Sequence, residues 1–296
     1  MRVFLTGATG FIGSALIPEL QRHGHRVLGL ARSDAGEQAL QALGADVLRG
    51  DLADLAALRR GAGQADGVVH CGFIHDFAKF AENCEIDRRA IVTLADALEG
   101  SGKPLVVTAG IPGMAGRPTT EDDEVPADNP TPRVSEQTAL AQVARGVRAS
   151  VVRLPQVHDR DKAGIVSYLT LIARQKGVSA YVGDGQNRWS AVHRLATASL
   201  YRLALEKGTA GARYQAVEEE GVPLKTIAES VGRGLKVPVR SLSPSEALAH
   251  FGPLGHFAGM SNPATSALTR ARLGWAPGDH PGLIDDVDQS TAYAAA

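Results

Sequence analysis

A glycine-rich turn near the start of the chain constrains the fold more than any other feature of the sequence. An apolar stretch over residues 3–5 leads into the run TGATGFIG over residues 6–13, and a segment of helical periodicity follows. This order indicates a strand, a tight turn and a helix. In such a turn Gly7 permits the bend, Gly10 lets the backbone approach a pyrophosphate, and Gly13 lets the helix close on the strand. The alternative is a flexible loop that binds nothing, since three glycines spaced G-x-x-G-x-x-G are by themselves a weak signal.

Length, charge and cysteine content bound the class of protein. The 296 residues can bury a core for one large domain or for two interlocked domains. The net charge of −1, from 31 basic and 32 acidic residues, argues against nucleic acid or an anionic membrane as a partner. The chain has only two cysteines, Cys71 and Cys84, which are too few for a disulfide framework or a metal-ligand cluster. The first apolar run is too short for a signal peptide and no stretch is long enough to span a membrane, so we expect a cytoplasmic protein with reduced thiols and no bound metal.

The residues after the second expected strand, over residues 25–31, indicate which dinucleotide binds. A carboxylate about 20 residues beyond the glycines would bind a free ribose 2′-hydroxyl, whereas a cation there accommodates a 2′-phosphate. Arg32 can form a forked pair with phosphate and Ser33 can donate from its hydroxyl, so we expect NADP, with NAD as the less favoured cofactor. Asp34 lies slightly too late for the carboxylate role, and an ordinary exposed cation is the other interpretation of Arg32.

Strands and helices alternate through the first half of the chain. Strand-like runs over residues 46–49, 68–72, 104–107 and 149–154 are separated by segments of helical periodicity. This alternation predicts an α/β protein with a doubly wound, Rossmann-type parallel sheet.

The wording TGATGFIG, at the start of a chain of this length, resembles the short-chain dehydrogenase/reductase superfamily. Within it, the sequence is similar to the extended and atypical branches, of the NAD-dependent epimerase/dehydratase and 3-beta-hydroxysteroid-dehydrogenase type. The resemblance covers nearly the whole chain, through to an LGW turn at residues 273–275. It implies a dinucleotide-binding domain over residues 1–158, with residues 186–207 returning to it, and a smaller substrate-binding lobe over residues 159–185 and 208–296.

The resemblance also places residues around the cofactor. Asp51 would accept a hydrogen bond from the adenine amino group and Leu52 would pack on the ring, although Asp51 could instead cap the following helix. Small residues after the fourth strand would pass under the cofactor. The full set expected to contact it is Thr6, Gly7, Thr9, Gly10, Phe11, Ile12, Gly13, Arg32, Ser33, Asp51, Leu52, Cys71, Gly72, Phe73, Thr108 and Pro155.

The catalytic signature of the resembled family, a Tyr-x-x-x-Lys motif on the helix after the fifth strand, is missing. With Ser135 aligned to the serine that commonly precedes the lysine, Pro132 and Glu136 take the tyrosine and lysine positions. A shift of one residue puts Arg133 and Gln137 there. No tyrosine occurs in the first 160 residues, so no other frame restores the motif. Hydride transfer without a positioned acid loses on the order of 10²–10⁴-fold in rate.

Three side chains could serve in place of the missing motif, because they follow strands at the carboxyl edge where ligands bind. Thr108 corresponds in the resembled family to a residue that hydrogen-bonds the substrate oxygen. His75 and His158 lie in the loops after the fourth and sixth strands, and a histidine is matched to proton transfer near neutral pH. We therefore expect Thr108 to orient the substrate and His75, beside Asp76, to donate the proton, with His158 as the second candidate. Water and Tyr181 are the remaining alternatives.

Three functions are compatible with these features. The favoured one is an NADP-dependent oxidoreductase that transfers hydride to or from a small carbonyl or hydroxyl compound, whose identity the sequence does not give. A redox-neutral epimerase or dehydratase would use the cofactor transiently. A non-catalytic NAD(P)-sensing module would keep the glycines and lose the acid, as this chain does. In the resembled family the helix expected over residues 78–99 often pairs subunits, so a homodimer is a further expectation.

Overall fold

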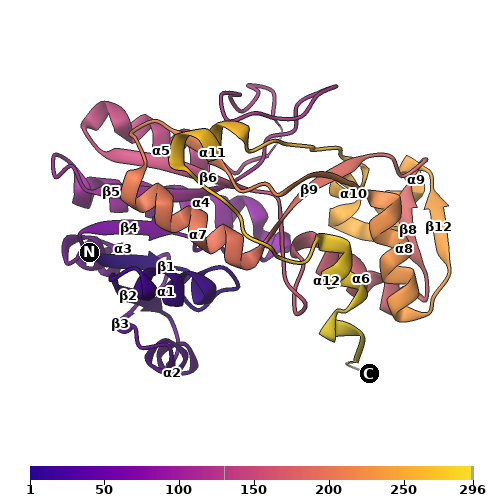
Figure 1. Ribbon diagram of the computed structural model, residues 1–296, viewed down its shortest axis with the longest axis horizontal. Helices are drawn as coiled ribbons and strands as arrows, with labels where there is room; N and C mark the ends of the chain where they lie inside the picture. Colours follow the sequence, from indigo (N-terminus) through magenta and orange to yellow (C-terminus); the bar gives the residue numbers. More distant parts are fainter. Residues whose placement is uncertain (130, 295–296) are drawn as a thin grey trace.

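A seven-stranded parallel sheet forms the larger part of the molecule, to the left in Figure 1. The computed structural model describes residues 1–129 and 131–294, and Pro130, Ala295 and Ala296 lie outside the described part. The strand order is β10-β6-β5-β4-β1-β2-β3, and every neighbouring pair is parallel. The bounds are β1 (Arg2–Thr6), β2 (Arg26–Ala31), β3 (Asp46–Arg49), β4 (Gly67–His70), β5 (Pro104–Gly110), β6 (Arg148–Leu154) and β10 (Arg213–Gln215). The predicted doubly wound sheet is confirmed, and its strand order reverses between β1 and β4, the place where such sheets bind ligands beyond the strand ends.

The alternating side chains of β1 explain how both faces of the sheet become covered. Val3 and Leu5 are buried on one face, whereas Phe4 is buried on the other. Successive strand residues point to opposite faces, so a strand covered on both faces reads as a continuous apolar run. The first face is covered by α1 (Gly13–Arg22), α2 (Asp34–Ala42) and α7 (Arg194–Lys207). The second is covered by α3 (Leu55–Gly63), α4 (Phe80–Leu98) and α5 (Ser135–Ala141).

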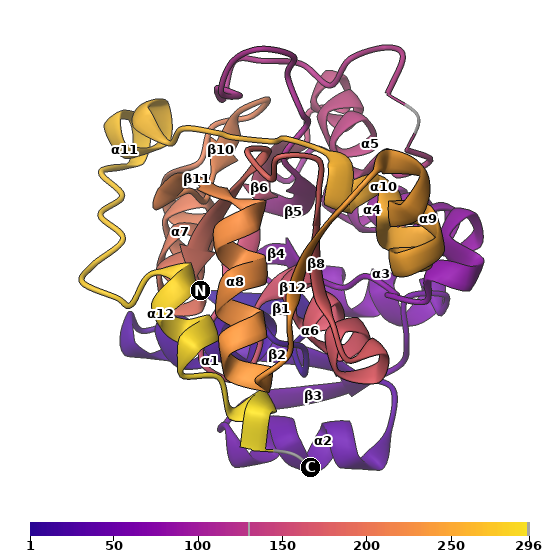
Figure 2. The ribbon, with the colours of Figure 1, turned by 90° about the vertical axis from the view of Figure 1, so that its right-hand side faces the viewer.

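The remaining strands and most of the remaining helices build a smaller lobe, to the right in Figure 1 and toward the viewer in Figure 2. Two small sheets, β11-β9-β7 and β12-β8, pack with helices around a separate core that includes Trp189, Leu224 and Phe251. The lobe contains β7 (Gln156–His158), α6 (Gly164–Lys176), β8 (Ser179–Val182), β9 (Arg188–His193), β11 (Glu219–Pro223), α8 (Leu224–Leu235), β12 (Val239–Leu242), α9 (Pro244–Phe251), α10 (Gly255–Gly259) and α12 (Leu283–Asp288). Strands β7 and β9 were expected with the larger domain, but β7 pairs with β9 and β9 pairs with β11, outside the central sheet.

Two parts of the range 208–296 lie on the central sheet, which corrects the predicted boundary of the smaller lobe. Strand β10 pairs in parallel with β6 and satisfies backbone groups that β6 would otherwise leave unpaired. Helix α11 (Ala267–Leu273) contacts β10 and α7. Just beyond it, Trp275 is 2% exposed and its indole nitrogen donates to the carbonyl oxygen of Ala196 at 3.2 Å. The LGW turn therefore closes the larger core.

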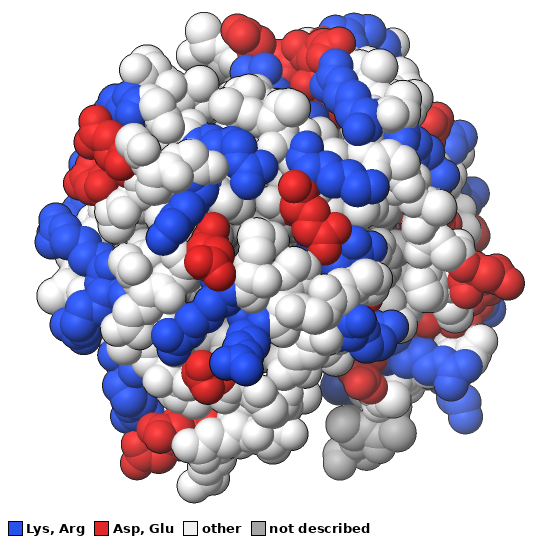
Figure 3. All heavy atoms as spheres, turned by 60° about the vertical axis from the view of Figure 1, so that its left-hand side comes forward, with Lys and Arg blue, Asp and Glu red and all other residues white. Residues whose placement is uncertain are grey.

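The lengths of the helices and the charges on the surface are relevant to whether a membrane or a nucleic acid could be a partner. Among the described residues, no helix is long and apolar enough to cross a membrane. On the face shown in Figure 3, Lys and Arg side chains are interspersed with Asp and Glu. A face with mixed charges does not create the single-sign potential that attracts a polyanion.

Candidate functional site

The glycine turn between β1 and α1 brings the ends of β1 and β4 into close contact. Gly7 has a φ of +67°, in the left-handed region that glycine adopts without strain. A Cβ at Gly7 would lie 2.7 Å from the backbone nitrogen of Gly72, and a Cβ at Gly13 would lie 2.2 Å from the carbonyl oxygen of Gly7. Neither position has room for a side chain. The predicted strand, turn and helix are confirmed, with β1 ending at Thr6 and α1 beginning at Gly13.

The N-terminus of α1 presents backbone donors that lack acceptors. Among the described residues, the N–H groups of Phe11, Ile12 and Gly13 make no hydrogen bond, and Ile12 at the N-cap has no capping side chain. Thr9 and Gly10 are exposed, so the surface above the turn is open. Unpaired N–H groups at the positive end of a helix dipole form a site for phosphate. The turn therefore fits the pyrophosphate of a dinucleotide.

The carboxyl end of β2 places an unpaired cation at the carboxyl edge of the central sheet, the edge at which the glycine turn also lies. Arg32 is exposed and makes no hydrogen bond or ion pair with the described residues. The Ser33 hydroxyl accepts from the N–H of Gly36 at 3.2 Å, which leaves its own proton for donation. Asp34 lies 3.0 Å from Arg49, so this carboxylate is already paired with a cation. The end of β2 therefore presents one unpaired cation, and the carboxylate two residues later is already paired.

Asp51 and Leu52 follow β3 at this edge. Oδ1 of Asp51 accepts from the N–H groups of Ala53 at 2.8 Å and Asp54 at 3.0 Å, whereas Asp54 itself caps α3. Asp51 therefore stabilises a turn ahead of the helix and is not its cap. Leu52 reaches the end of β4, since a Cβ on Gly72 would lie 2.9 Å from Cδ2 of Leu52. Contact of these residues with an adenine ring stays a prediction.

Thr108, at the end of β5, is hydrogen-bonded to other groups of the fold at the carboxyl edge of the central sheet. Its hydroxyl donates to the carbonyl oxygen of His70 at 2.8 Å and lies 2.6 Å from the hydroxyl of Tyr201 on α7. Tyr201 is fully buried, and burial raises its pKa well above the usual value. Burial also raises the pKa of the neighbouring Cys71 thiol to about 12. The Thr108 hydroxyl is thus engaged by two groups of the fold, and its expected role in orienting a substrate stays a prediction.

A buried chain of hydrogen bonds runs below the glycine turn. The Thr6 hydroxyl oxygen accepts from the N–H of Gly72 at 3.2 Å and lies 2.8 Å from Nδ1 of His70. Nε2 of His70 lies 3.1 Å from Asp87 on α4, whose other oxygen accepts from the Ser135 hydroxyl at 2.5 Å. Burial opposes ionisation of Asp87, but these bonds hold its pKa below the usual value. The chain of bonds fixes β1, β4, α4 and α5 relative to one another.

Arg133 lies at the edge where the missing acid would be expected. Its guanidinium lies over the Phe73 ring, with Cζ 4.2 Å from the ring centroid. Nε donates to the Ser135 hydroxyl at 2.9 Å, and one terminal nitrogen donates to the carbonyl oxygen of Thr108 at 3.3 Å. In the alignment shifted by one residue Arg133 takes the tyrosine position, and this is the sequence signal that identifies it. The guanidinium is thereby fixed beside the carboxyl ends of β4 and β5.

The lysine position of the other alignment holds a buried carboxylate. Glu136 is 3% exposed and pairs with Arg153 at 2.6 Å and with Arg213 at 2.7 Å. Arg153 is 0% exposed and also donates to the carbonyl oxygens of Thr120 and Asp123. Glu136 thus anchors α5 to β6 and β10. This role explains why a charge opposite to that of lysine is found here.

His75 lies beside Arg133 in the loop after β4. Its ring packs edge-on against Phe73, with centroids 5.3 Å apart. Part of the side chain remains accessible, yet crowding by the surrounding chain and then the charges of Arg133 and Lys162 lower its pKa below the usual value. A cation next to an acid makes its proton easier to lose, which is the effect that lysine has on tyrosine in the resembled family. Asp76, expected to assist His75, instead accepts from the N–H of Ala78 in a short helical turn.

His158 lies away from this edge, between β7 and α12. It is 1% exposed, with Nδ1 2.7 Å from Asp286 and Nε2 3.8 Å from Glu219. Both ring nitrogens face carboxylates within the fold, and a role of His158 as proton donor stays a prediction. Tyr181, the remaining alternative, packs in the smaller lobe with the Lys225 ammonium 5.9 Å from its ring centroid. Pro155 is half-buried between β6 and β7, and its contact with the cofactor stays a prediction.

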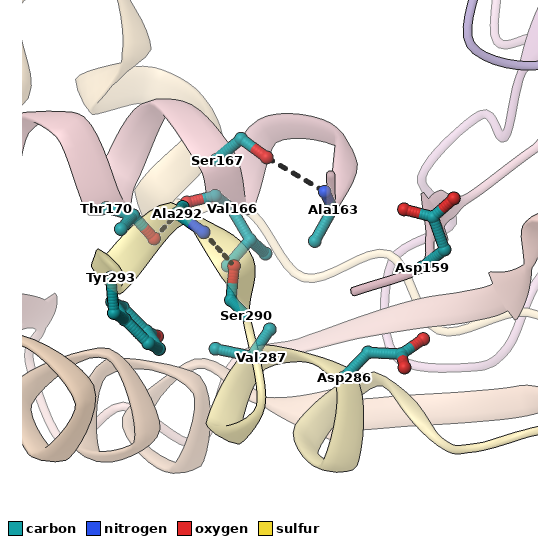
Figure 4. A pocket seen from close by; sticks show the side chains of 10 residues that line it. All are labelled: Asp159, Ala163, Val166, Ser167, Thr170, Asp286, Val287, Ser290, Ala292 and Tyr293. Atoms are coloured by element: carbon teal, nitrogen blue, oxygen red, sulfur yellow. Dashed lines mark hydrogen bonds between the residues drawn. The ribbon is translucent and has the colours of Figure 1, made fainter. Parts of the chain in front are cut away.

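Two hollows adjoin the loop after β7. A cavity of about 20 Å³ between α6 and α12, drawn in Figure 4, has room for about one water molecule. A larger, open depression has a volume of about 380 Å³. It is lined by Asp159, Arg160, Asp161, His193, Arg194, Leu195, Pro281 and Asp286. Five of these eight lining residues are Asp or Arg.

Comparisons with known proteins agree with this geometry. The family model described as the NAD dependent epimerase/dehydratase family matches residues 3–218. An uncharacterized protein of Schizosaccharomyces pombe is 46% identical over 297 residues, which covers 99% of this chain and 100% of that protein. The sterol-4-alpha-carboxylate 3-dehydrogenase, decarboxylating, of Dictyostelium discoideum is 30% identical over 229 residues, covering 70% of this chain and 68% of that protein.

Solved structures show the same fold at low sequence identity. The UDP-glucose 4-epimerase of Thermotoga maritima, solved with UDP-glucose, has a TM-score of 0.77 at 19% identity and covers 99% of this chain and 98% of its own. The dTDP-glucose 4,6-dehydratase of Streptomyces venezuelae, solved with NAD and TYD bound, has a TM-score of 0.79 at 18% identity, with 99% and 96% covered.

Proposed function

Because the chain belongs to the NAD-dependent epimerase/dehydratase family, we propose that it is an NADP-dependent oxidoreductase that transfers hydride to or from a small carbonyl or hydroxyl compound. The observation that carries the proposal is that a fixed cation, Arg133, and a titratable group, His75, both pack on Phe73 at the carboxyl ends of β4 and β5. A bound nicotinamide cofactor would supply the hydride. The residues present fit that cofactor, since the turn at the N-terminus of α1 is open and has unpaired N–H groups.

In this proposal Arg133 and His75 share the roles of the tyrosine and lysine of the family's motif. Arg133 would stabilise negative charge on the substrate oxygen, and His75 would donate the proton. A carbonyl oxygen that gains negative charge is stabilised by a positioned cation, and Arg133 is held in place by Phe73, Ser135 and Thr108. Arginine does not release a proton near neutral pH, so it cannot be the acid. His75 can hold a proton at a ring nitrogen and release it readily, because its pKa is lowered.

The choice of NADP over NAD is part of the proposal. It is supported by the unpaired guanidinium of Arg32 and by the pairing of Asp34 with Arg49. A homodimer through α4 also remains a prediction. The exposed face of that helix is charged, with Glu85 and Arg88 paired at 2.7 Å, so an interface there would be polar.

The test is consumption of NADPH in the presence of small aldehydes and ketones, followed by absorbance and by identification of the alcohol formed. Gly10→Val serves as the control. Within the fold a Cβ at Gly10 would meet only Gly7, whose carbonyl oxygen lies at 3.0 Å and carbonyl carbon at 3.9 Å, but it would occupy the space of the pyrophosphate. We expect turnover by the unmutated protein and none by the variant, with similar circular dichroism spectra. NADPH binding without oxidation of any compound would favour a sensor, and conversion of a sugar nucleotide without net oxidation would favour an epimerase or dehydratase.

A further inference from the structure

Arg194, the first residue of α7, contacts the glycine turn although it lies far from that turn in the sequence. Its guanidinium lies over the Phe11 ring, with Cζ 4.7 Å from the ring centroid. One terminal nitrogen donates to the Ser14 hydroxyl at 2.7 Å, and Ser14 donates in turn to the carbonyl oxygen of Gly10 at 2.8 Å. A residue 180 positions away is thereby fixed on the first turn of α1.

Part of this guanidinium has no partner in the fold. Nε of Arg194 is buried and makes no hydrogen bond with any described residue. A buried donor without an acceptor is destabilising, and such groups are rare unless a ligand or water satisfies them. This unpaired Nε belongs to a side chain that also lines the depression of about 380 Å³.

Asp159 positions a second cation next to the first. Its Oδ2 accepts from Arg194 at 3.0 Å, and its Oδ1 accepts from the N–H groups of Asp161 at 2.9 Å and Lys162 at 3.0 Å. The resulting turn holds the ammonium of Lys162 5.7 Å from the centroid of the Phe11 ring. That ammonium makes no hydrogen bond or ion pair with the described residues. Two cations from the loop after β7 and the start of α7 therefore lie on one ring of the glycine turn.

We infer that Arg194 and Lys162, positioned by Asp159, form a second wall of the phosphate site, facing the glycine turn. The inference rests on the proposed function and assigns pyrophosphate contacts to residues outside the turn. The N-terminus of a helix carries a partial charge of only about +0.5, which does not neutralise a doubly charged pyrophosphate. Lys162 supplies a positive charge that no described carboxylate pairs with. Each terminal nitrogen of Arg194 donates one proton within the fold and keeps a second N–H for a phosphate oxygen.

The test is equilibrium binding of NADPH, NADH and ADP-ribose, measured by isothermal titration calorimetry. Arg194→Met keeps an extended side chain against Phe11 but removes the charge. We expect it to raise the Kd by about 10- to 100-fold, and by the same factor for all three ligands because each contains the pyrophosphate. Lys162→Met is expected to give a smaller rise in the same direction, since an ammonium is a point charge without the guanidinium fork.

Arg202→Met is the matched control, because Arg202 also joins α7 to α1, through Glu19 at 2.8 Å, but makes no contact with the glycine turn. It should leave all three Kd values unchanged. If Arg194→Met binds as tightly as the unmutated protein while Gly10→Val does not bind, the inference is overturned and the proposed cofactor site stands. A loss confined to NADPH and NADH would place the contact at the nicotinamide and overturn the phosphate assignment.

Failure of the unmutated protein to bind any of the three ligands would overturn the proposed function and the inference together. Circular dichroism of each variant separates lost binding from lost folding. Should Arg194→Met fail to fold, Lys162→Met decides the question, because the Lys162 ammonium holds no contact that the fold needs. An unchanged Kd in that variant would then remove Lys162 from the wall and overturn the inference of a two-cation site.

Discussion

Arg32 shows how a single side chain can decide which cofactor a Rossmann fold accepts. Its guanidinium is exposed and unpaired at the end of β2. We expect Arg32→Asp to reverse the preference from NADPH to NADH, because losing a forked, charge-assisted pair costs about 1.5–3 kcal/mol, or roughly 10- to 100-fold in affinity. Arg26→Asp, at the other end of the same strand, should leave the ratio of the two Kd values unchanged. Equal affinity of the unmutated protein for both cofactors would contradict the prediction.

His75 and Arg133 make a second prediction at the scale of single residues. If His75 donates the proton, His75→Ala should lower kcat by about 100-fold or more on a confirmed substrate. The pKa of His75 is lowered, so the rate of the unmutated protein should fall as pH rises through a value below about 6.5. The variant should lack this limb of the pH profile. Near-full turnover by His75→Ala would rule out histidine acid catalysis and leave water as the proton source.

Removal of the cation tests the pairing of these two residues. Arg133→Met should lower kcat and also move the same limb to higher pH, because the charge that lowers the pKa of His75 is gone. A residue that acts only through packing would lower kcat without moving the limb. Arg89→Met, an exposed arginine on α4, is the matched control and should change neither quantity.

At the scale of elements, the sequence predicts what depends on neighbouring residues and misses what depends on distant ones. The strand at residues 46–49 and the helix expected over residues 78–99, which is α4 at Phe80–Leu98, are found where hydrophobic periodicity places them. Strand β10 is missed because three residues carry too little periodicity, and only its pairing with β6 makes it a strand. The glycine turn can be predicted from the sequence because the strand, the turn and the helix follow one another along the chain. The contact of Arg194 with Phe11 cannot be predicted from the sequence, because it arises only when α7 packs on α1.

Helix α12 gives a prediction at this scale, because one carboxylate holds it to β7. Asp286 is 2% exposed, and its Oδ2 lies 2.7 Å from Nδ1 of His158 and 3.9 Å from Nε2 of His193. We expect Asp286→Asn to lower the free energy of unfolding by about 1.5–3 kcal/mol, the usual contribution of a hydrogen bond to a charged group. Urea unfolding at neutral pH is the measurement. Asp285→Asn, an exposed neighbour on the same helix, should change stability by much less, and equal losses would mean that the tether to His158 adds nothing.

At the scale of the whole molecule, two histidines far apart in the fold couple stability to pH in the same direction. Burial, followed by the charge of His280, lowers the pKa of His193, and burial followed by the charge of Lys176 lowers that of His250. Between the lowered pKa and the ordinary value of about 6.5, the unfolded chain binds more protons than the folded one. The stability that these groups contribute is therefore complete above about pH 6.5 and is lost as pH falls through their folded pKa values.

We expect the melting temperature to hold between about pH 7 and 8 and to decline below about pH 6.5. The double variant His193→Gln, His250→Gln should decline less over the same interval, because glutamine does not titrate. Glu218 has a pKa raised by burial and acts with the opposite sign, losing its contribution as pH rises, but it is present in both proteins and cancels in their difference. His256→Gln, an exposed histidine on α10, serves as the control for loss of an imidazole. Identical pH profiles of the double variant and the unmutated protein would show that these two histidines do not couple proton binding to folding.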